Sequence, residues 1–335
     1  MTKKLIQIEN NHDPRVLRIE WAMGNLCNQS CYYCFPGSHE GDIPWPSDIE
    51  LLKKNFSKLF DHYKKFGKDI FQLYLIGGEP TLWKELPKLT EYFKENYDVI
   101  INISTNAYRK LDWWERNGKF FDHVEISVHN EFAKVEHLMA VADQLYEAET
   151  MVVANVLMDP KNFDYCQSIV EKMKTSRHDW PIILKTVHFD GVPTYTDEQR
   201  KFFDVMKPRM PDKENIRKFF KGKLEENKYW AIFDDGEKFS TPGDRWFALE
   251  KLNHFYGWQC NLGVDMIKIN FNGEISGSCL EYLYELDYHY NLLQPNFAEK
   301  FEPKIKSLRC TKIICSCTAE IVIQKHKVIN LTAVQ

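Results

Sequence analysis

The chain has 335 residues, of which 44% are hydrophobic, 14% aromatic and 27% charged. This composition excludes a mainly disordered chain, because 22 Phe, 16 Tyr and 9 Trp supply ample apolar surface for a core. No apolar run approaches the roughly 20 residues that cross a bilayer, and the polar N-terminal residues argue against a signal peptide. We therefore expect a cytoplasmic protein with no membrane partner. The formal net charge of −4 disfavours a dedicated nucleic-acid-binding module.

From about residue 16 to 190, short apolar segments typical of strands alternate with helical patterns. The predicted strands are Val16–Trp21, Ile70–Ile76, Val99–Ser104, Val124–Val128, Met151–Met158 and Ile182–Phe189. A capping box at 47–50 predicts a first helix, Thr81 is the predicted cap of the next, and two more are predicted near 131–147 and 162–174. Such alternation implies parallel strands joined by right-handed crossovers. Six units fall short of a closed eight-unit barrel, so we expect an α/β fold, a partial (β/α)6 TIM-like barrel.

After Gly191 this alternation stops. A charged helical pattern over 195–225 precedes two predicted hairpins, Tyr229–Thr241 and Asp265–Ser278, the second with a strong Asn-Gly turn signal. We therefore expect three regions: the barrel core at 1–191, a helical and hairpin connecting region at 192–258, and a small cysteine-rich C-terminal domain at 259–335.

Eight of the nine cysteines fall into two groups, which in a cytoplasmic chain indicates metal ligation rather than disulfides. The first group, Cys27, Cys31 and Cys34, directly follows the first predicted strand. Three thiolates on a four-iron cluster leave one iron with an open coordination site, which suits catalysis. A zinc site with His39 as the fourth ligand is the alternative. The isolated Cys166 is expected to be a small core residue, or alternatively a thiol hydrogen-atom donor.

The segment Gly77-Gly78-Glu79-Pro80 follows the second predicted strand. Two glycines let the backbone approach a ligand closely, and the Glu79 carboxylate suits a ligand ammonium group. A plain strand-ending turn is the alternative. Both this segment and the first cysteine group fall at the carboxyl ends of predicted parallel strands, where such folds bind ligands.

Together, the Cys-x-x-x-Cys-x-x-Cys spacing, the aromatic Tyr33 before Cys34, and Gly77–Pro80 resemble the radical S-adenosylmethionine (SAM) superfamily over about residues 15–190. The resemblance implies that Cys27, Cys31 and Cys34 hold a [4Fe-4S] cluster whose open iron binds SAM. It also implies reductive cleavage of SAM to a 5′-deoxyadenosyl radical that abstracts a substrate hydrogen, with an electron donor such as flavodoxin or ferredoxin. The implied cofactor-binding residues are Tyr33, Gly77, Gly78, Glu79, Pro80, Asn106, Ser127 and Asn155. For the last three, a structural hydrogen-bonding role is the alternative; for His129, a general base or a solvated loop residue.

The second cysteine group is Cys260, Cys279, Cys310, Cys315 and Cys317. Its layout around the second hairpin resembles the auxiliary-cluster "twitch" domain of some radical SAM enzymes, a relative of the SPASM domain. The resemblance implies a second, auxiliary [4Fe-4S] cluster that assists electron transfer. The favoured ligands are Cys260, Cys279, Cys315 and Cys317, with Cys310 as a further candidate. A structural zinc site is the alternative.

Enzymes that combine these two domains mostly modify peptides, so the resemblance favours a peptide side chain or backbone as substrate. About 14 residues precede the first predicted strand, too few for the leader-peptide-binding domain of many such enzymes. Oxidation or rearrangement of a small molecule, such as a sugar, an antibiotic precursor or a nucleotide, is therefore the alternative. A non-catalytic iron–sulfur or zinc binding scaffold is the remaining hypothesis.

Overall fold

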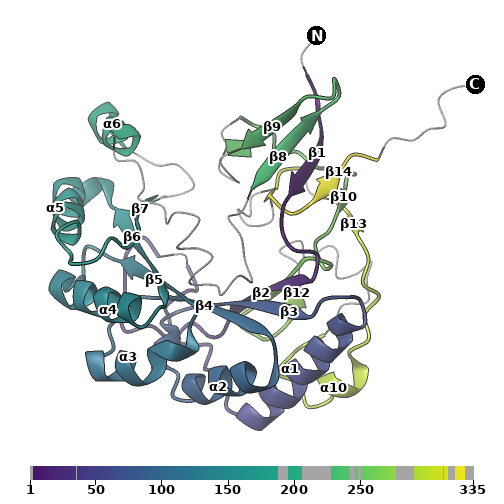
Figure 1. Ribbon diagram of the computed structural model, residues 1–335, viewed down its shortest axis with the longest axis horizontal. Coiled ribbons are helices and arrows are strands. Elements are labelled where there is room, and N and C mark those ends of the chain that lie inside the picture. The colour runs from purple at the N-terminus through teal and green to yellow at the C-terminus, as the bar shows by residue number, and fades with distance from the viewer. Residues whose placement is uncertain are drawn as a thin grey trace, which may run out of the picture. The chain divides into compact units, whose positions relative to one another are not determined.

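The computed structural model describes most of the chain (Figure 1). The described residues are 3–34, 36–187, 195–205, 228–241, 246–247, 250–276, 290–311, 313–315 and 321–328. They belong to two compact units. The first, here the parallel unit, comprises Trp21–Ile49 and Gln72–Leu224. The second, here the terminal unit, comprises Met1–Glu20, Glu50–Phe71 and Glu225–Gln335.

Parallel strands form the larger sheet. They are β2 (Val16–Ala22), β3 (Ile70–Ile76), β4 (Val99–Thr105), β5 (His123–Val128), β6 (Met151–Met158) and β7 (Ile182–Thr186). Two short strands, β11 (Met266–Ile269) and β12 (Ile275–Ser276), extend the sheet, whose order is β12-β11-β2-β3-β4-β5-β6-β7. The pairs β4/β5, β5/β6 and β6/β7 are parallel. The predicted α/β fold, a partial TIM-like barrel of parallel strands, is confirmed.

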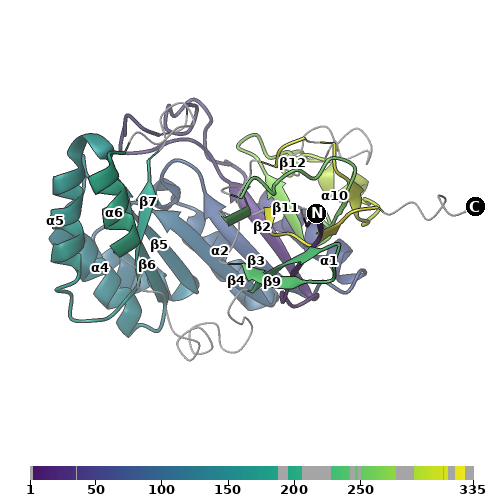
Figure 2. The same cartoon turned by 90° about the horizontal axis from the view of Figure 1, so that it is seen from above.

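Helices connect these strands along the chain. They are α1 (Ile49–Lys64), α2 (Leu86–Asn96), α3 (Leu111–Asn117), α4 (Val135–Glu147), α5 (Phe163–Met173) and α6 (Asp197–Val205), with 3-10 turns η1 (Pro80–Leu82), η2 (Gly118–Phe120) and η3 (Pro160–Asn162). In the parallel unit, α4 and α5 lie along one side of β5 and β6 (Figure 2). Their apolar faces supply the buried side chains that pack against the sheet.

The strand β5 shows how the sequence separates core from site. Val124, Ile126 and Val128 are fully buried, whereas the alternating residues, which include Glu125 and Ser127, are only partly buried. Because successive side chains of a strand point to opposite faces, one face of β5 is apolar and the other polar. The polar face leads to Ser127 at the carboxyl end of the strand.

The terminal unit is built on an antiparallel sheet. Its strands are β1 (Leu5–Asn10), β8 (Tyr229–Phe233), β9 (Lys238–Thr241), β10 (Gln259–Cys260), β13 (Leu308–Arg309) and β14 (Lys325–His326), in the order β13-β10-β14-β1-β8-β9. The unit also contains the short helix α10 (Phe297–Lys300). Both predicted hairpins are confirmed, since β8 pairs with β9 and β11 with β12, each antiparallel.

Some predictions of elements were wrong. The strand predicted at Val16–Trp21 is confirmed as β2, but β1, which precedes it, was not predicted. Neither was α3, because its seven residues are too short for a clear period. Thr81 does not cap α2, which begins five residues later with Glu85 at its N-cap. β7 ends at Thr186, and the rest of the predicted strand lies largely outside the described residues. The predicted region boundaries at 191 and 258 stay predictions. No described helix is long and apolar enough to cross a membrane.

Candidate functional site

A cavity of about 100 Å³ lies at the carboxyl ends of the parallel strands, and Cys27, Cys31 and Cys34 all line it. The other predicted site residues that line it are Gly77, Gly78, Glu79, Asn106 and Ser127. Tyr33, Pro80 and Asn155 do not. The fold therefore brings together residues that are up to 100 positions apart in the sequence.

Asn25 holds the loop that carries the three cysteines. Its fully buried side chain donates to Asp42 Oδ1 at 2.6 Å and to Gly37 O at 3.0 Å, and accepts from Ile43 N at 2.8 Å. A single amide thus joins the start of the loop to its end. Asn25 was not predicted, because a lone asparagine after a strand carries no motif signal.

The thiols are poorly solvated. Cys31 is 5% exposed, and Cys27 and Cys34 are partly buried. Burial raises the pKa of Cys27, and it raises the pKa of Cys31 to about 12. A thiolate at these positions needs a positive partner to offset its desolvation. Iron supplies that charge, so the donor set fits a metal centre.

The three cysteines line one cavity but form no site for a single metal ion within the described residues. Within the described residues, no three or more His, Cys, Asp or Glu side chains converge closely enough to hold one metal ion. His39 lines the same cavity as the cysteines but belongs to no such set. A [4Fe-4S] cluster binds each cysteine to a different iron and does not require this convergence. Three thiols that line one cavity are the donors that the predicted cluster requires, and the zinc alternative stays a prediction.

Gly78 lies against the cysteine loop. A Cβ atom at this position would stand 2.1 Å from Leu26 O, and the next residue, Glu79, donates its backbone N–H to the same oxygen at 2.8 Å. Gly77 has a φ of 110°, which side-chain-bearing residues rarely adopt. The neighbour that requires glycine at position 78 is thus the backbone that precedes Cys27, and the predicted close approach of these glycines to a ligand stays a prediction.

Glu79 is fully buried and joins two strand ends. Its Oε1 accepts from Thr105 Oγ1 at 2.6 Å, from Thr81 Oγ1 at 2.5 Å and from Thr81 N at 3.1 Å, while Oε2 accepts from Asn106 N at 2.6 Å. Burial raises its pKa, and these hydrogen bonds act in the opposite direction. Thr105 and Thr81 were not predicted as site residues. The carboxylate is an organising group as well as a lining group of the cavity.

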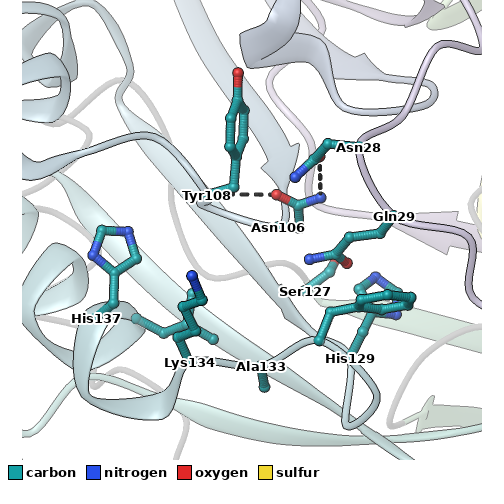
Figure 3. Close-up of a pocket in the computed structure, with 11 residues that line it drawn as sticks. Asn28, Gln29, Asn106, Tyr108, Ser127, His129, Ala133, Lys134 and His137 are labelled. Atoms are coloured by element: carbon teal, nitrogen blue, oxygen red, sulfur yellow. Dashed lines mark hydrogen bonds between the residues drawn. The ribbon is translucent and has the colours of Figure 1, made fainter.

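Asn106 links the end of β4 to the cysteine loop. Its Nδ2 donates to Asn28 Oδ1 at 2.9 Å and lies 3.9 Å from Cys27 Sγ, and its Oδ1 accepts from Tyr108 N at 3.2 Å (Figure 3). The hydrogen bond between Asn106 and Asn28 therefore joins the end of β4 to the cysteine loop. The predicted contact of Asn106 with a cofactor stays a prediction.

Ser127 and Asn155 are register partners on β5 and β6. Ser127 Oγ lies 3.5 Å from Ser104 Oγ and lines the cavity. Asn155 donates to Glu125 Oε2 at 3.0 Å, and its buried Oδ1 has no hydrogen-bond partner within the described residues. It lies beside the site without lining the cavity.

A second cavity, of about 250 Å³, adjoins the first and shares Gln29, Asn106, Ser127 and His129 with it. Figure 3 shows Tyr108, Lys134 and His137 around it. His137 Nε2 lies 3.1 Å from Ala107 O and 3.0 Å from Arg109 O, so this nitrogen donates. The two cavities together offer room for a ligand larger than an iron–sulfur cluster.

His129 is neither solvated nor isolated. Its ring stacks on Tyr33 with centroids 5.7 Å apart, and Nδ1 lies 3.1 Å from the Tyr33 hydroxyl. Burial lowers the pKa of His129 to about 4, so the imidazole is neutral at pH 7. Cys166 is fully buried and donates to Leu157 O at 3.4 Å, as expected of a core thiol, and burial raises its pKa to about 11.

Three cysteines of the second group lie in or against one core cluster of the terminal unit. Cys260 and Cys310 are buried there, and Cys315 packs against the same cluster. Backbone hydrogen bonds fix their places: Cys310 N donates to Trp258 O at 2.7 Å, and Cys315 N to Asn253 O at 2.8 Å. None of the seven described cysteines is in a disulfide within the described residues. Cys279 and Cys317 lie outside them.

Comparison with known proteins shows what the parallel unit is similar to. Residues 21–148 match the family model of the radical SAM superfamily. The chain is 32% identical over 103 residues to Fe-coproporphyrin III synthase of Methanosarcina barkeri, and 25% identical over 142 residues to GTP 3′,8-cyclase of Psychromonas ingrahamii. These matches cover 31% and 40% of this chain, but only 23% and 38% of the relatives.

A solved structure, anSMEcpe with bound AdoMet, has a similar fold. It shares a TM-score of 0.51 and 16% identity with this chain, over 86% of this chain and 81% of that one. The family match spans the cysteine loop, Gly77–Glu79 and Ser127. The similarity to the radical SAM superfamily is therefore shown for residues 21–148, and the chain spans well under half the length of the curated relatives it matches.

Proposed function

We propose that this chain is a radical SAM enzyme. The observation that carries the proposal is the single cavity lined by Cys27, Cys31 and Cys34 together with the Gly77–Glu79 strand end. When bound, a [4Fe-4S] cluster with SAM supplies an electron that cleaves the cofactor to a 5′-deoxyadenosyl radical able to abstract a hydrogen atom from a substrate. Such chemistry belongs to the cofactor, and the protein supplies binding, orientation and the exclusion of water.

The residues of the parallel unit divide this work. Cys27, Cys31 and Cys34 would hold the cluster, which would supply an open iron site for SAM. Gly78 lets the cysteine loop lie directly on the end of β3, while Glu79 fixes the ends of β3 and β4. Polar groups of Asn106 and Ser127 line the cavity where SAM binds. We assign Tyr33, Pro80 and Asn155 to the surrounding shell, because they do not line this cavity.

An auxiliary [4Fe-4S] cluster in the terminal unit forms the second part of the proposal. The shared core position of Cys260, Cys310 and Cys315 supports it. The favoured ligands remain Cys260, Cys279, Cys315 and Cys317, with Cys310 as the further candidate. A closed cluster of this kind serves electron transfer, and a flavodoxin or ferredoxin in the cytoplasm supplies the first electron.

For the substrate, we propose a peptide side chain or backbone, and a small molecule as the second candidate. The names of the curated relatives favour the second candidate, since GTP and coproporphyrin are small molecules. The two candidates differ in which compound gives its hydrogen to 5′-deoxyadenosine. A candidate substrate labelled with deuterium at the reacting carbon identifies the donor by mass spectrometry.

The test of the enzyme itself is the formation of 5′-deoxyadenosine from SAM under anaerobic conditions. We expect dithionite-dependent formation in the wild type and none in the Cys27/Cys31/Cys34→Ala variant. Cys166→Ala is the matched control, because Cys166 is a buried thiol outside both groups, and it should keep the activity. A wild type that binds iron but forms no 5′-deoxyadenosine would support the binding-scaffold hypothesis instead.

A further inference from the structure

The cysteine loop is hydrogen-bonded to the parallel sheet through residues that belong to no sequence motif. Between Cys31 and Cys34 stand two tyrosines, and both are hydrogen-bonded to residues at the carboxyl ends of β5 and β6. Tyr32 donates its hydroxyl hydrogen to Asp159 Oδ1 at 2.6 Å. Tyr33 donates to Asn130 Oδ1 at 3.2 Å, and Asn130 in turn donates through Nδ2 to Asp159 Oδ2 at 3.3 Å. Both tyrosines therefore lead to one carboxylate.

Asp159 is built to act as an anchor. It is fully buried, directly after β6, and its two oxygens also accept from Lys161 N at 2.9 Å and from Asn162 Nδ2 at 3.0 Å. Burial alone raises its pKa, but the hydrogen bonds outweigh that effect and leave the pKa below its ordinary value. The ammonium of Lys161 lies 4.4 Å from the centroid of the Tyr32 ring and secures the same side chain by a cation–π contact.

We propose that Asp159 is the positioning residue that sets the conformation of the segment from Cys31 to Cys34. It acts through Tyr32 directly and through Asn130 on Tyr33. The inference concerns the loop itself, and its use in holding a cluster rests on the proposed function. An alternative role for Asp159 is to cap η3, since two of its four hydrogen bonds go to residues of that turn.

The experiment compares single side-chain deletions at the two ends of this network. Tyr32→Phe removes only the hydroxyl that bonds Asp159 toward the loop. Asn162→Ala removes a hydrogen bond to the same carboxylate from the η3 side. Tyr165→Phe, at a half-exposed tyrosine on α5, controls for the loss of a hydroxyl in general.

The first readout needs no metal. In iron-free protein, iodoacetamide labelling is followed at Cys31 by peptide mass spectrometry, with the buried Cys166 in the same digest reporting any general opening of the fold. We expect Tyr32→Phe to speed Cys31 labelling, relative to Cys166, about tenfold, a factor that corresponds to about 1.4 kcal/mol. Asn162→Ala and Tyr165→Phe should stay within about twofold of the wild type. An unchanged rate in Tyr32→Phe, or an equal increase in Asn162→Ala, would overturn the proposal.

A double-variant comparison covers the central residue. We expect Asp159→Ala to speed Cys31 labelling at least as much as Tyr32→Phe does. The double variant should label Cys31 no faster than Asp159→Ala alone, because Tyr32 acts through Asp159. Additive effects would mean that the two residues act separately, which contradicts the proposal. If Asp159→Ala labels Cys166 as fast as Cys31, the variant has lost its fold, and the Tyr32→Phe result decides alone.

The second readout is the reconstituted protein. We expect Tyr32→Phe to release iron to a chelator faster than the wild type and to alter the change that SAM makes in the EPR spectrum of the reduced cluster. If the wild type binds no iron at Cys27, Cys31 and Cys34, the proposed function fails, whereas the labelling result for the iron-free loop still stands. The two failures are thus told apart.

Discussion

Thr105 Oγ1 lies 2.6 Å from Glu79 Oε1, in a fully buried contact between the ends of β4 and β3. The same carboxylate receives Asn106 N, the next residue of the chain. The sheet ladder pairs Thr105 with Ile126 of β5, and the Glu79 carboxylate adds a side-chain link from this end of β4 to the segment that follows β3.

Replacing Glu79 by Gln should destabilise the protein. The glutamine amide keeps one oxygen, but its NH2 group faces N–H and O–H groups that now donate to the carboxylate. Those buried donors would lose their acceptor, which costs about 1–3 kcal/mol in the free energy of unfolding. In a unit of this size each kcal/mol lowers the thermal midpoint by about 2–4 °C, so we expect a fall of about 2–12 °C. Glu91→Gln, at an exposed position on α2, is the control and should leave the midpoint unchanged. Equal midpoints for the two variants would contradict the role given to Glu79.

Replacing Gly78 by Ala should be severe. The new Cβ meets a backbone oxygen, Leu26 O, at 2.1 Å, so the cysteine loop must move as a whole. We expect a loss of about 3 kcal/mol or more in stability and a loss of iron binding at the first cysteine group. Gly118→Ala is the matched control, because its nearest neighbour is the movable side-chain atom Leu145 Cδ2 at 2.7 Å. If both variants retained iron equally, the packing argument at Gly78 would be wrong.

His129 should make the protein sensitive to mild acid. The folded state holds its pKa at about 4, below the ordinary value of 6.5, so the unfolded state binds a proton more readily. Stability is therefore present above pH 6.5 and is lost as the pH falls toward 4. The thermal midpoint of His129→Gln should fall less steeply over this range than that of the wild type. His326→Gln, at an exposed position, should follow the wild-type curve, and identical curves for all three proteins would refute the prediction.

The second cysteine group can be tested one thiol at a time. With Cys260 and Cys315 as ligands and Cys310 as a spare, Cys260→Ala and Cys315→Ala should each lose about four irons per chain, whereas Cys310→Ala keeps them. SAM should still perturb the EPR signal of the remaining cluster in all three. Loss of iron in Cys310→Ala with retention in Cys315→Ala would exchange their roles. Zinc in place of iron would make the site structural.

Much of the parallel unit was predictable because its signals are local. Strong apolar runs gave Ile70–Ile76 and Met151–Met158 with their observed bounds. The clustering of the three cysteines beside Gly77–Glu79 followed from topology, since parallel strands end at one edge. The strand β1 was missed because its residues alternate only weakly and it pairs with β8 and β14, more than 200 positions away.

The parts of the site that were missed are side chains defined only by their partners. Asn25, Thr105 and Asp159 are single polar residues whose burial and hydrogen bonds arise from the tertiary fold. A sequence shows a polar residue after a strand but not which loop returns to meet it. Asp159, one residue beyond the end of β6, carried the only available hint, because its place at a strand end matches that of Glu79 after β3.

The most direct test of the central claim is the iron and acid-labile sulfide content, with Mössbauer spectra, of anaerobically reconstituted wild type and of the Cys27/Cys31/Cys34→Ala variant. Two four-iron clusters predict about eight irons in the wild type and about four in the variant, and SAM should perturb the EPR spectrum of the wild type only. A wild type with about four irons, all of them lost in the variant, would support the radical SAM site and contradict the auxiliary cluster. Zinc without iron, or an iron content that the variant does not change, would contradict the account.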